Sequence, residues 1–165
     1  PAYDVHAAGD HDANFYLWGA MGGAALMGLG LAQARPDRRV LVITGDGEQL
    51  MGLGGLATIG AAGPRNLMIA VIDNQHFGET GMQASHTGRG VDLAAVATAC
   101  GFASAVTVFD ATGLAALCRH LQKPADGPRL AVVKVASVNP PRSLPIRDAV
   151  ALKTRFRAAL GLGPN

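Results

Sequence analysis

Charged side chains are scarce in this sequence of 165 residues. Asp, Glu, Lys and Arg make up 16% of the chain, whereas apolar residues make up 49%. Soluble monomers usually carry more charge, so we expect another subunit to cover much of the surface. The net charge is only +2, and no basic cluster is denser than residues 35–39. This balance gives no indication of a nucleic-acid partner.

Cysteine is also rare. Cys100 and Cys118 lie in different segments, and neither belongs to a CxxC or Cys/His ligand pattern. We therefore expect two buried thiols rather than a disulfide or a metal site.

A secretory signal and a membrane helix are not expected either. Residues 1–12 are polar and acidic, and the chain begins with Pro1 rather than Met, so we expect the native N-terminus to lie upstream. Residues 15–34 are uncharged over a length that could span a bilayer, but they include five glycines and Gln33. A helix packed between a sheet and a partner subunit is the better interpretation. We expect a cytoplasmic protein.

Apolar runs alternate with helical patterns along the chain. We expect strands at 39–44, 66–72, 103–109 and 129–136, and helices at 19–34, 47–62, 92–100, 112–122 and 148–160. This order predicts an α/β fold with a doubly wound parallel sheet and helices on both faces. We interpret residues 1–165 as one domain, with an irregular lead-in at 1–14 and a linker at 137–147 before the last helix.

Two strand exits carry polar groups that could bind a ligand. Asp46, in a Gly-Asp-Gly triplet, follows one predicted strand, and Asn74 follows the next. The carboxyl ends of parallel strands meet at one sheet edge, where open α/β sheets bind their ligands. A carboxylate, an amide oxygen and glycine-exposed N–H groups at a helix start suit a divalent cation that carries a diphosphate.

The Gly-Asp-Gly segment resembles the motif of thiamine-diphosphate enzymes. In that family an Asn-Asn pair follows the triplet at about this spacing, and here the pair is Asp73-Asn74. Residues 19–22 and 74–78 occupy the places of the family's other cofactor contacts. The match covers roughly residues 10–102 and is similar to the diphosphate-binding domain of 2-oxoacid decarboxylases and acetolactate synthases. Within that group, the chain most resembles the separate β subunits of sulfopyruvate decarboxylases and their phosphonopyruvate relatives.

The resemblance implies how Mg²⁺ and thiamine diphosphate would be held. The Asp46 carboxylate, the Asn74 side-chain oxygen and the His76 backbone carbonyl would bind Mg²⁺, with two diphosphate oxygens and a water. Backbone N–H groups of Gly47 and Glu48 would meet the diphosphate. The implied cofactor contacts are Gly19, Met21, Gly45, Asp46, Gly47, Glu48, Asn74, His76, Phe77 and Gly78.

Gly19 and Met21 belong to the other end of the implied cofactor site. By resemblance, the Gly19 carbonyl would accept a hydrogen bond from the aminopyrimidine, and Met21 would hold the two cofactor rings in a bent arrangement. Two positions depart from the family pattern. Asp73 replaces an Asn that is not a metal ligand, so little should change. Glu48 replaces the commoner Ser, and its carboxylate must point away from the phosphates, meet a cation from another chain, or weaken binding.

The loop at residues 74–90 is long for a compact domain, and such loops are usually functional or disordered. By resemblance, Thr80 would face the thiazolium. Its neighbour Glu79 could relay protons or be a solvated charge. His86 could bind an anionic substrate tail or transfer a proton, or be an exposed loop histidine. His6, His11 and His120 are expected at the surface.

We expect no counterpart of the family's activating glutamate in these residues, because it belongs to a pyrimidine-binding domain and no second domain of that kind fits into 165 residues. The resemblance therefore implies a catalytic partner, an α subunit that supplies the glutamate in an α2β2 or larger assembly, and a small 2-oxoacid as substrate. Three alternatives stay open. They are a carboligase subunit, a non-catalytic scaffold subunit, and a dinucleotide-binding module based on the GxGxxA pattern at residues 52–57 with Asp73.

Overall fold

The computed structural model describes residues 1–163 of the chain. The chain forms two compact units, of which one spans Met21–Asn139 and the other combines Pro1–Ala20 with Pro140–Asn165. No helix in the described part of the chain is long and apolar enough to cross a membrane. The uncharged segment that begins at Phe15 contains one helix, α2 (Ala24–Ala34).

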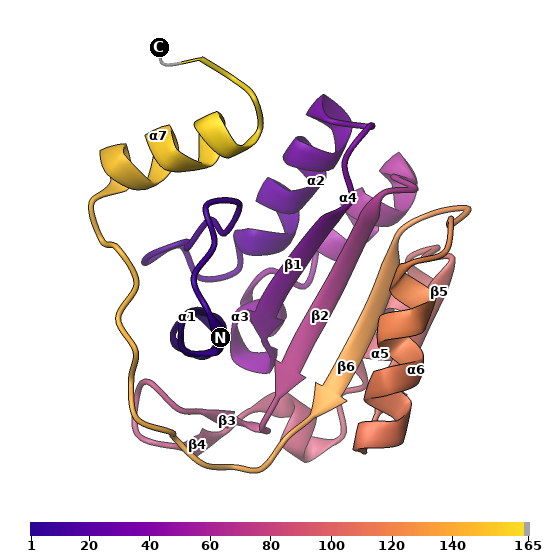
Figure 1. The fold of residues 1–165 in the computed structure, drawn as a ribbon. Helices are drawn as coiled ribbons and strands as arrows, with labels where there is room; N and C mark the ends of the chain where they lie inside the picture. Colours follow the sequence, from indigo (N-terminus) through magenta and orange to yellow (C-terminus); the bar gives the residue numbers. More distant parts are fainter. Residues whose placement is uncertain (164–165) are drawn as a thin grey trace. The chain divides into compact units, whose positions relative to one another are not determined.

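A parallel four-stranded sheet forms the centre of the larger unit (Figure 1). Its strands run in the order β1-β2-β6-β5. Their bounds are Val40–Gly45 for β1, Leu67–Asp73 for β2, Ser104–Val108 for β5 and Arg129–Lys134 for β6. Each strand is a short run rich in Val, Ile, Leu and Ala, which suits a sheet covered on both faces. The predicted strands are therefore all present, with ends shifted by one or two residues.

Helices pack on both faces of this sheet. The remaining helices of the unit are α3 (Asp46–Met51), α4 (Gly55–Ala62), α5 (Leu93–Ala99) and α6 (Ala111–Leu121). One apolar core joins α2, α4 and α5 to the sheet, and a second joins α6 to β2, β5 and β6. The two cores confirm the predicted α/β fold with helices on both faces. Because α6 packs on the other strands, Leu41 and Ile43 of β1 remain exposed.

The glycine-rich segment after β1 differs from the single helix predicted at 47–62. The helix begins at Asp46 and is divided into α3 and α4, because the backbones of Gly52 and Gly22 approach so closely that a Cβ on Gly52 would collide. Gly22 has φ +85, a left-handed conformation, which also explains why α2 begins at Ala24 rather than at residue 19. The GxGxxA pattern thus lies beyond the first helix rather than at the strand exit, which argues against a dinucleotide site.

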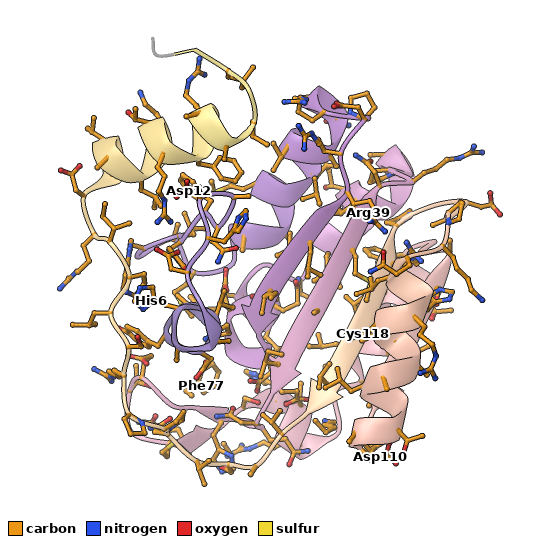
Figure 2. All side chains as sticks on the ribbon, in the orientation of Figure 1. His6, Asp12, Arg39, Phe77, Asp110 and Cys118 are labelled. Atoms are coloured by element: carbon orange, nitrogen blue, oxygen red, sulfur yellow. The ribbon has the colours of Figure 1, made fainter. Side chains whose placement is uncertain are left out.

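Several other predictions can be compared with the structure. Asp92, the first residue of the helix predicted at 92–100, is the N-cap of α5, and its carboxylate accepts hydrogen bonds from the backbone N–H groups of Ala94 (2.9 Å) and Ala95 (3.0 Å). The cysteine prediction is wrong in part. Both thiols are free, but Cys118 is exposed on α6 (Figure 2) and Cys100 is only half-buried. Cys118 is exposed because Leu117 is the residue of α6 that is buried against the sheet.

The second unit contains both ends of the described chain. Residues 1–14 are not wholly irregular, since they contain α1 (Ala2–Ala8), and the last helix is α7 (Ala149–Ala159). Arg155 of α7 binds the Asp10 carboxylate at 2.6 Å. Hydrogen bonds from Arg155 and Tyr16 lower the pKa of Asp10 from its ordinary value to about 2. The Phe15 and Phe156 rings meet edge to face, with centroids 5.4 Å apart. No regular secondary structure is assigned between 135 and 148, a range that includes the predicted linker.

Candidate functional site

The exits of β1 and β2 bring two carboxylates together. The strands are parallel, and Gly45 is level with Ile72, so Asp46 and Asp73 leave the sheet side by side. Asp46 begins α3, and Asp73 ends β2. Both are buried, with 2% and 1% of their surface exposed. Figure 1 shows this carboxyl edge, marked by the arrowheads of the strands, with the hairpin strands β3 (His76–Phe77) and β4 (Gln83–Ala84) beside it.

Two hydroxyl groups bind these carboxylates. Ser85 donates a short hydrogen bond to Asp46 Oδ2, and Thr87 Oγ1 lies 3.2 Å from the same oxygen. Thr87 Oγ1 is also 2.8 Å from Asp73 Oδ1 and 2.9 Å from Ser85 Oγ. Both residues are buried, and Thr87 belongs to the short 3-10 helix η1 (His86–Arg89). The loop after β2 therefore returns to the sheet and joins the two strand exits.

Asp73 has a cationic partner at the end of the neighbouring strand. Lys134 Nζ of β6 lies 2.5 Å from Asp73 Oδ2, and the Asp73 side chain is fully buried. The other carboxylate oxygen, Oδ1, accepts from the backbone N–H of Gln75 at 2.9 Å. The substitution of Asp for the usual Asn thus coincides with a lysine on β6 that neutralises it. A cavity of about 230 Å³ adjoins the pair and is lined in part by Thr87 and Phe109.

Asn74 and His76 form a turn directly after β2. Asn74 Oδ1 accepts from the His76 backbone N–H at 3.0 Å. The His76 ring nitrogen Nδ1 lies 2.9 Å from the Asn74 carbonyl oxygen and 2.8 Å from Ser137 Oγ. These bonds fix the backbone from which the His76 carbonyl and the Asn74 side chain project.

The start of α3 requires a glycine. A Cβ on Gly47 would lie 2.6 Å from the ring of Phe77, so this ring packs directly against the helix start. Gly78 is similarly close to Asn139, whose amide group donates to the Gly78 carbonyl at 3.1 Å. The predicted contacts Gly47, Phe77 and Gly78 are thus neighbours of the two strand exits.

Glu48 is bound within its own chain. Its carboxylate accepts from Thr44 Oγ1 at 2.5 Å and from the backbone N–H of Ala24 at 3.4 Å. Ala24 is the first residue of α2, where a negative charge is stabilised by the helix dipole. The Glu48 carboxylate therefore has hydrogen-bond partners within this chain, which the sequence prediction did not identify.

The three predicted catalytic residues lie on the loop after β2. Glu79, Thr80 and His86 are all exposed. Thr80 Oγ1 lies 3.0 Å from Gln83 Oε1. His86 is exposed between two buried neighbours, Ser85 and Thr87. The hydroxyl groups of these two neighbours, and not the predicted His86 side chain, reach Asp46.

The predicted pyrimidine contacts belong to different units. Gly19 lies in the unit formed by the chain ends and has φ +71, whereas Met21 begins the larger unit and is 56% exposed. In residues 1–163 no cluster of three His, Cys, Asp or Glu side chains could hold a metal. The predicted Mg²⁺ ligands would not form such a cluster, because only Asp46 contributes a carboxylate. The other two ligands are the side-chain amide of Asn74 and the backbone carbonyl of His76.

Ser85, Thr87 and Lys134 are polar site residues that the sequence prediction missed. The alternation Ser-His-Thr indicates that residues 85 and 87 share a side opposite to His86, but the direction of that side depends on the path of the loop. Lys134 is the last residue of β6, level with Asp73 at the end of β2, and a lysine at the end of an apolar strand is the signal that could have identified it.

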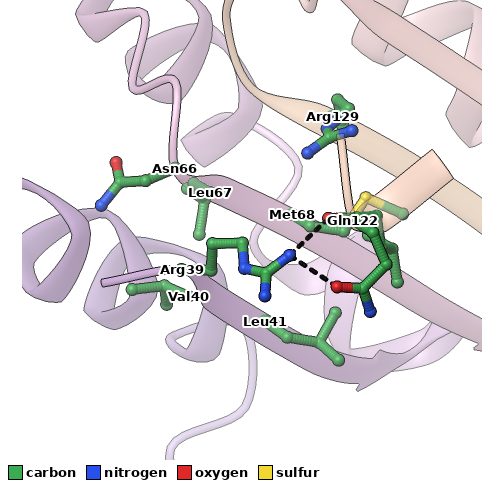
Figure 3. A pocket seen from close by; sticks show the side chains of 9 residues that line it. Arg39, Val40, Leu41, Asn66, Leu67, Met68, Gln122 and Arg129 are labelled. Carbon is green, nitrogen blue, oxygen red and sulfur yellow. Dashed lines mark hydrogen bonds between the residues drawn. The ribbon is translucent and has the colours of Figure 1, made fainter. Parts of the chain in front are cut away.

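A second pocket lies at the amino edge of the sheet (Figure 3). It has a volume of about 180 Å³, and Arg39 and Arg129 are among the residues that line it. Arg39 Nη1 donates to the Leu121 carbonyl at 3.2 Å and to Gln122 Oε1 at 2.9 Å. Arg129 is buried and donates to the carbonyls of His120 (2.8 Å) and Lys123 (3.2 Å). Both guanidinium groups thus bind carbonyls at the C-terminus of α6, which is a structural role.

Comparisons with known proteins identify the family. Residues 5–135 match the family described as thiamine pyrophosphate enzyme, C-terminal TPP binding domain. Sulfopyruvate decarboxylase subunit beta of Methanocaldococcus jannaschii is 43% identical over 107 residues, which are 65% of this chain and 56% of that protein. Phosphonopyruvate decarboxylase of Streptomyces viridochromogenes is 48% identical over 99 residues, 60% of this chain and 24% of that one.

Two further similarities extend the comparison. Sulfopyruvate decarboxylase of Methanosarcina acetivorans is 33% identical over 161 residues, 97% of this chain and 41% of that protein. The fold is similar to that of a Mycobacterium smegmatis protein assigned as a thiamin diphosphate-dependent enzyme, with a TM-score of 0.56 and 23% identity over 72% of this chain and 22% of that one. The chain thus matches about half or less of the length of these relatives. By its match over residues 5–135, the chain belongs to the family of C-terminal TPP binding domains of thiamine pyrophosphate enzymes.

Proposed function

We propose that the chain is the β-type subunit of a 2-oxoacid decarboxylase that depends on thiamine diphosphate and Mg²⁺. The names of the relatives support this class of reaction, since they include sulfopyruvate and phosphonopyruvate decarboxylases. The burial of Asp46 without an ion-pair partner in residues 1–163 is the structural observation that carries the proposal.

Asp46 is buried, and no Lys or Arg side chain in the described part of the chain forms an ion pair with it. Its neighbour Asp73 has Lys134 for this purpose. A buried carboxylate is costly unless a cation balances it or it binds a metal. The nearby Asn74 amide oxygen and His76 carbonyl add two neutral oxygen ligands, the kind of set that suits Mg²⁺. The residues present therefore fit the proposed metal.

The proposed division of roles follows the strand exits. Asp46, Asn74 and His76 would hold Mg²⁺, and the backbone N–H groups of Gly47 and Glu48 would bind the diphosphate. When bound, thiamine diphosphate supplies the electron sink for loss of CO2. The other proposed contacts are Gly19, Met21, Gly45, Phe77 and Gly78. Glu79, Thr80 and His86 stay proposed substrate-side residues, whose exposure on one loop allows contact with a substrate or a partner chain.

A partner subunit would supply the activating glutamate and a pyrimidine-binding domain. Several relatives are named as beta subunits, which supports an assembly with a different chain. Exposed apolar side chains also support it. Leu26 and Met27 on α2 are exposed, as are Met21 and Met51, of which Met51 is 64% exposed. Apolar groups of this size are usually covered in an assembly. The α2β2 or larger stoichiometry and the cytoplasmic location belong to the same proposal.

The test is CO2 release by the complex in which the chain purifies, with thiamine diphosphate, Mg²⁺ and a panel of 2-oxoacids that includes sulfonate and phosphonate substrates. We expect turnover by the complex and none by the isolated chain. Turnover by the isolated chain would contradict the need for a partner glutamate. A complex that consumes pyruvate but forms a carboligation product would favour the carboligase alternative, and a complex that binds no cofactor would favour the scaffold.

A further inference from the structure

The two carboxylate oxygens of Asp46 have different surroundings. Oδ2 accepts from Ser85 Oγ and lies 3.2 Å from Thr87 Oγ1. No hydrogen bond to Oδ1 is formed by any group in residues 1–163. Oδ2 is thus held by a hydrogen bond within the chain, whereas Oδ1 has no such partner in these residues.

The Thr87 hydroxyl group is itself bound to the next strand, β2. Thr87 Oγ1 lies 2.8 Å from Asp73 Oδ1, closer than its 3.2 Å to Asp46. Because a hydroxyl has a single proton, the shorter distance favours donation by Thr87 to Asp73, while Ser85 donates to Asp46. Asp73 is fixed in turn by Lys134 at 2.5 Å. The position of the Asp46 carboxylate is therefore linked to the ends of β2 and β6.

We propose that Ser85 and Thr87 are positioning residues for the Mg²⁺ that carries the diphosphate. Ser85 holds Asp46 Oδ2 by its hydrogen bond, and Thr87 links this pair to Asp73, so that Asp46 Oδ1 is directed at the metal. This inference rests on the proposed function. Mg²⁺ requires nearly ideal octahedral geometry, so a rotated carboxylate loses much of its value as a ligand. Hydrogen bonds to ligand groups maintain that geometry, and their loss typically weakens metal affinity about 10- to 100-fold.

A purely structural role would give a different result. If Ser85 and Thr87 only fastened the loop to the sheet, their loss would lower stability and weaken every metal equally. Ca²⁺ tolerates irregular geometry better than Mg²⁺. A carboxylate that is no longer oriented should therefore lose more affinity for Mg²⁺ than for Ca²⁺, and the ratio of the two affinities distinguishes the two roles.

The experiment measures thiamine diphosphate binding at increasing Mg²⁺ or Ca²⁺ by calorimetry, with the full chain in the complex in which it purifies. Thr87→Val keeps the shape of the side chain and removes the hydroxyl, Thr87→Ser keeps the hydroxyl, and Ser85→Ala removes the other donor. Ile59→Val, in the buried core of α4, serves as the control for lost stability.

We expect Thr87→Val and Ser85→Ala to weaken Mg²⁺-dependent binding about 10- to 100-fold and to lower the Mg²⁺-to-Ca²⁺ affinity ratio. Thr87→Ser and Ile59→Val should retain both. If the wild-type complex binds the cofactor and both hydroxyl-deleting variants bind Mg²⁺ as it does, the positioning role is wrong. If Thr87→Val does not fold, Ser85→Ala decides. Failure of the wild-type complex to bind the cofactor would instead contradict the proposed function.

Discussion

The two edges of the parallel sheet hold charged side chains in different ways. At the amino edge, the guanidinium groups of Arg39, which is exposed, and Arg129, which is buried, bind the carbonyls at the end of α6. At the carboxyl edge, Asp46 and Asp73 accept from Ser85 and Thr87, and a lysine neutralises only one of them.

This difference separates a structural arrangement from a binding site. The last carbonyls of a helix lack partners within the helix, so the two arginines satisfy groups that need a donor in any case. At the carboxyl edge, the described chain provides no donor for one oxygen of Asp46 and no cation for its charge. Both edges have a small cavity, so cavity volume does not tell a binding site from a structural arrangement. The Asp46 carboxylate does, because the described chain gives it no cation and leaves one of its oxygens without a donor.

The largest expected change in stability at the carboxyl edge follows removal of the lysine. Lys134→Met leaves the fully buried Asp73 carboxylate without its cation, which should lower the free energy of unfolding by about 3 kcal/mol. Chemical denaturation of the purified chain measures this. The double variant Asp73→Asn with Lys134→Met removes both charges and should recover most of the loss. Equal destabilisation of the single and double variants would show that charge balance is not the reason.

A smaller change is expected at the amino edge. Arg129→Met keeps an apolar stem of similar length but leaves the carbonyls of His120 and Lys123 without their donor. The free energy of unfolding should fall by about 2 kcal/mol, since hydrogen bonds from charged donors are worth about that much. Mg²⁺-dependent binding of thiamine diphosphate by the folded protein should not change. If that binding is lost while the protein remains folded, the amino edge is not merely structural.

The strands that carry the candidate site could be predicted from the sequence, because their signals are local. Strand exits are set by apolar runs and by parallel register, so the positions of Asp46 and Asn74 directly after β1 and β2 follow from patterns within a few residues. The N-cap Asp92 is predictable for the same reason, because its partners lie two and three residues further along the chain.

Features that depend on distant segments are not predicted. The break between α3 and α4 arises from the approach of Gly52 to Gly22, and no local pattern records that contact. Ser85 and Thr87 reach Asp46 only because the loop folds back over the strand exits. The sequence does not show this path, so the prediction selected His86, which lies between them, for the chemistry of its side chain. Glu48 likewise finds its partner at the start of α2, which lies earlier in the chain.

The most direct test of the account is Mg²⁺-dependent binding of thiamine diphosphate by the complex containing wild-type chain, Asp46→Ala or Arg129→Met. Asp46→Ala should weaken binding by more than about 100-fold, beyond the loss expected for a residue that only supports a ligand. Arg129→Met should bind as the wild type does, although it is less stable. Unchanged affinity in a folded Asp46→Ala complex would contradict the claim that this carboxylate holds the cation.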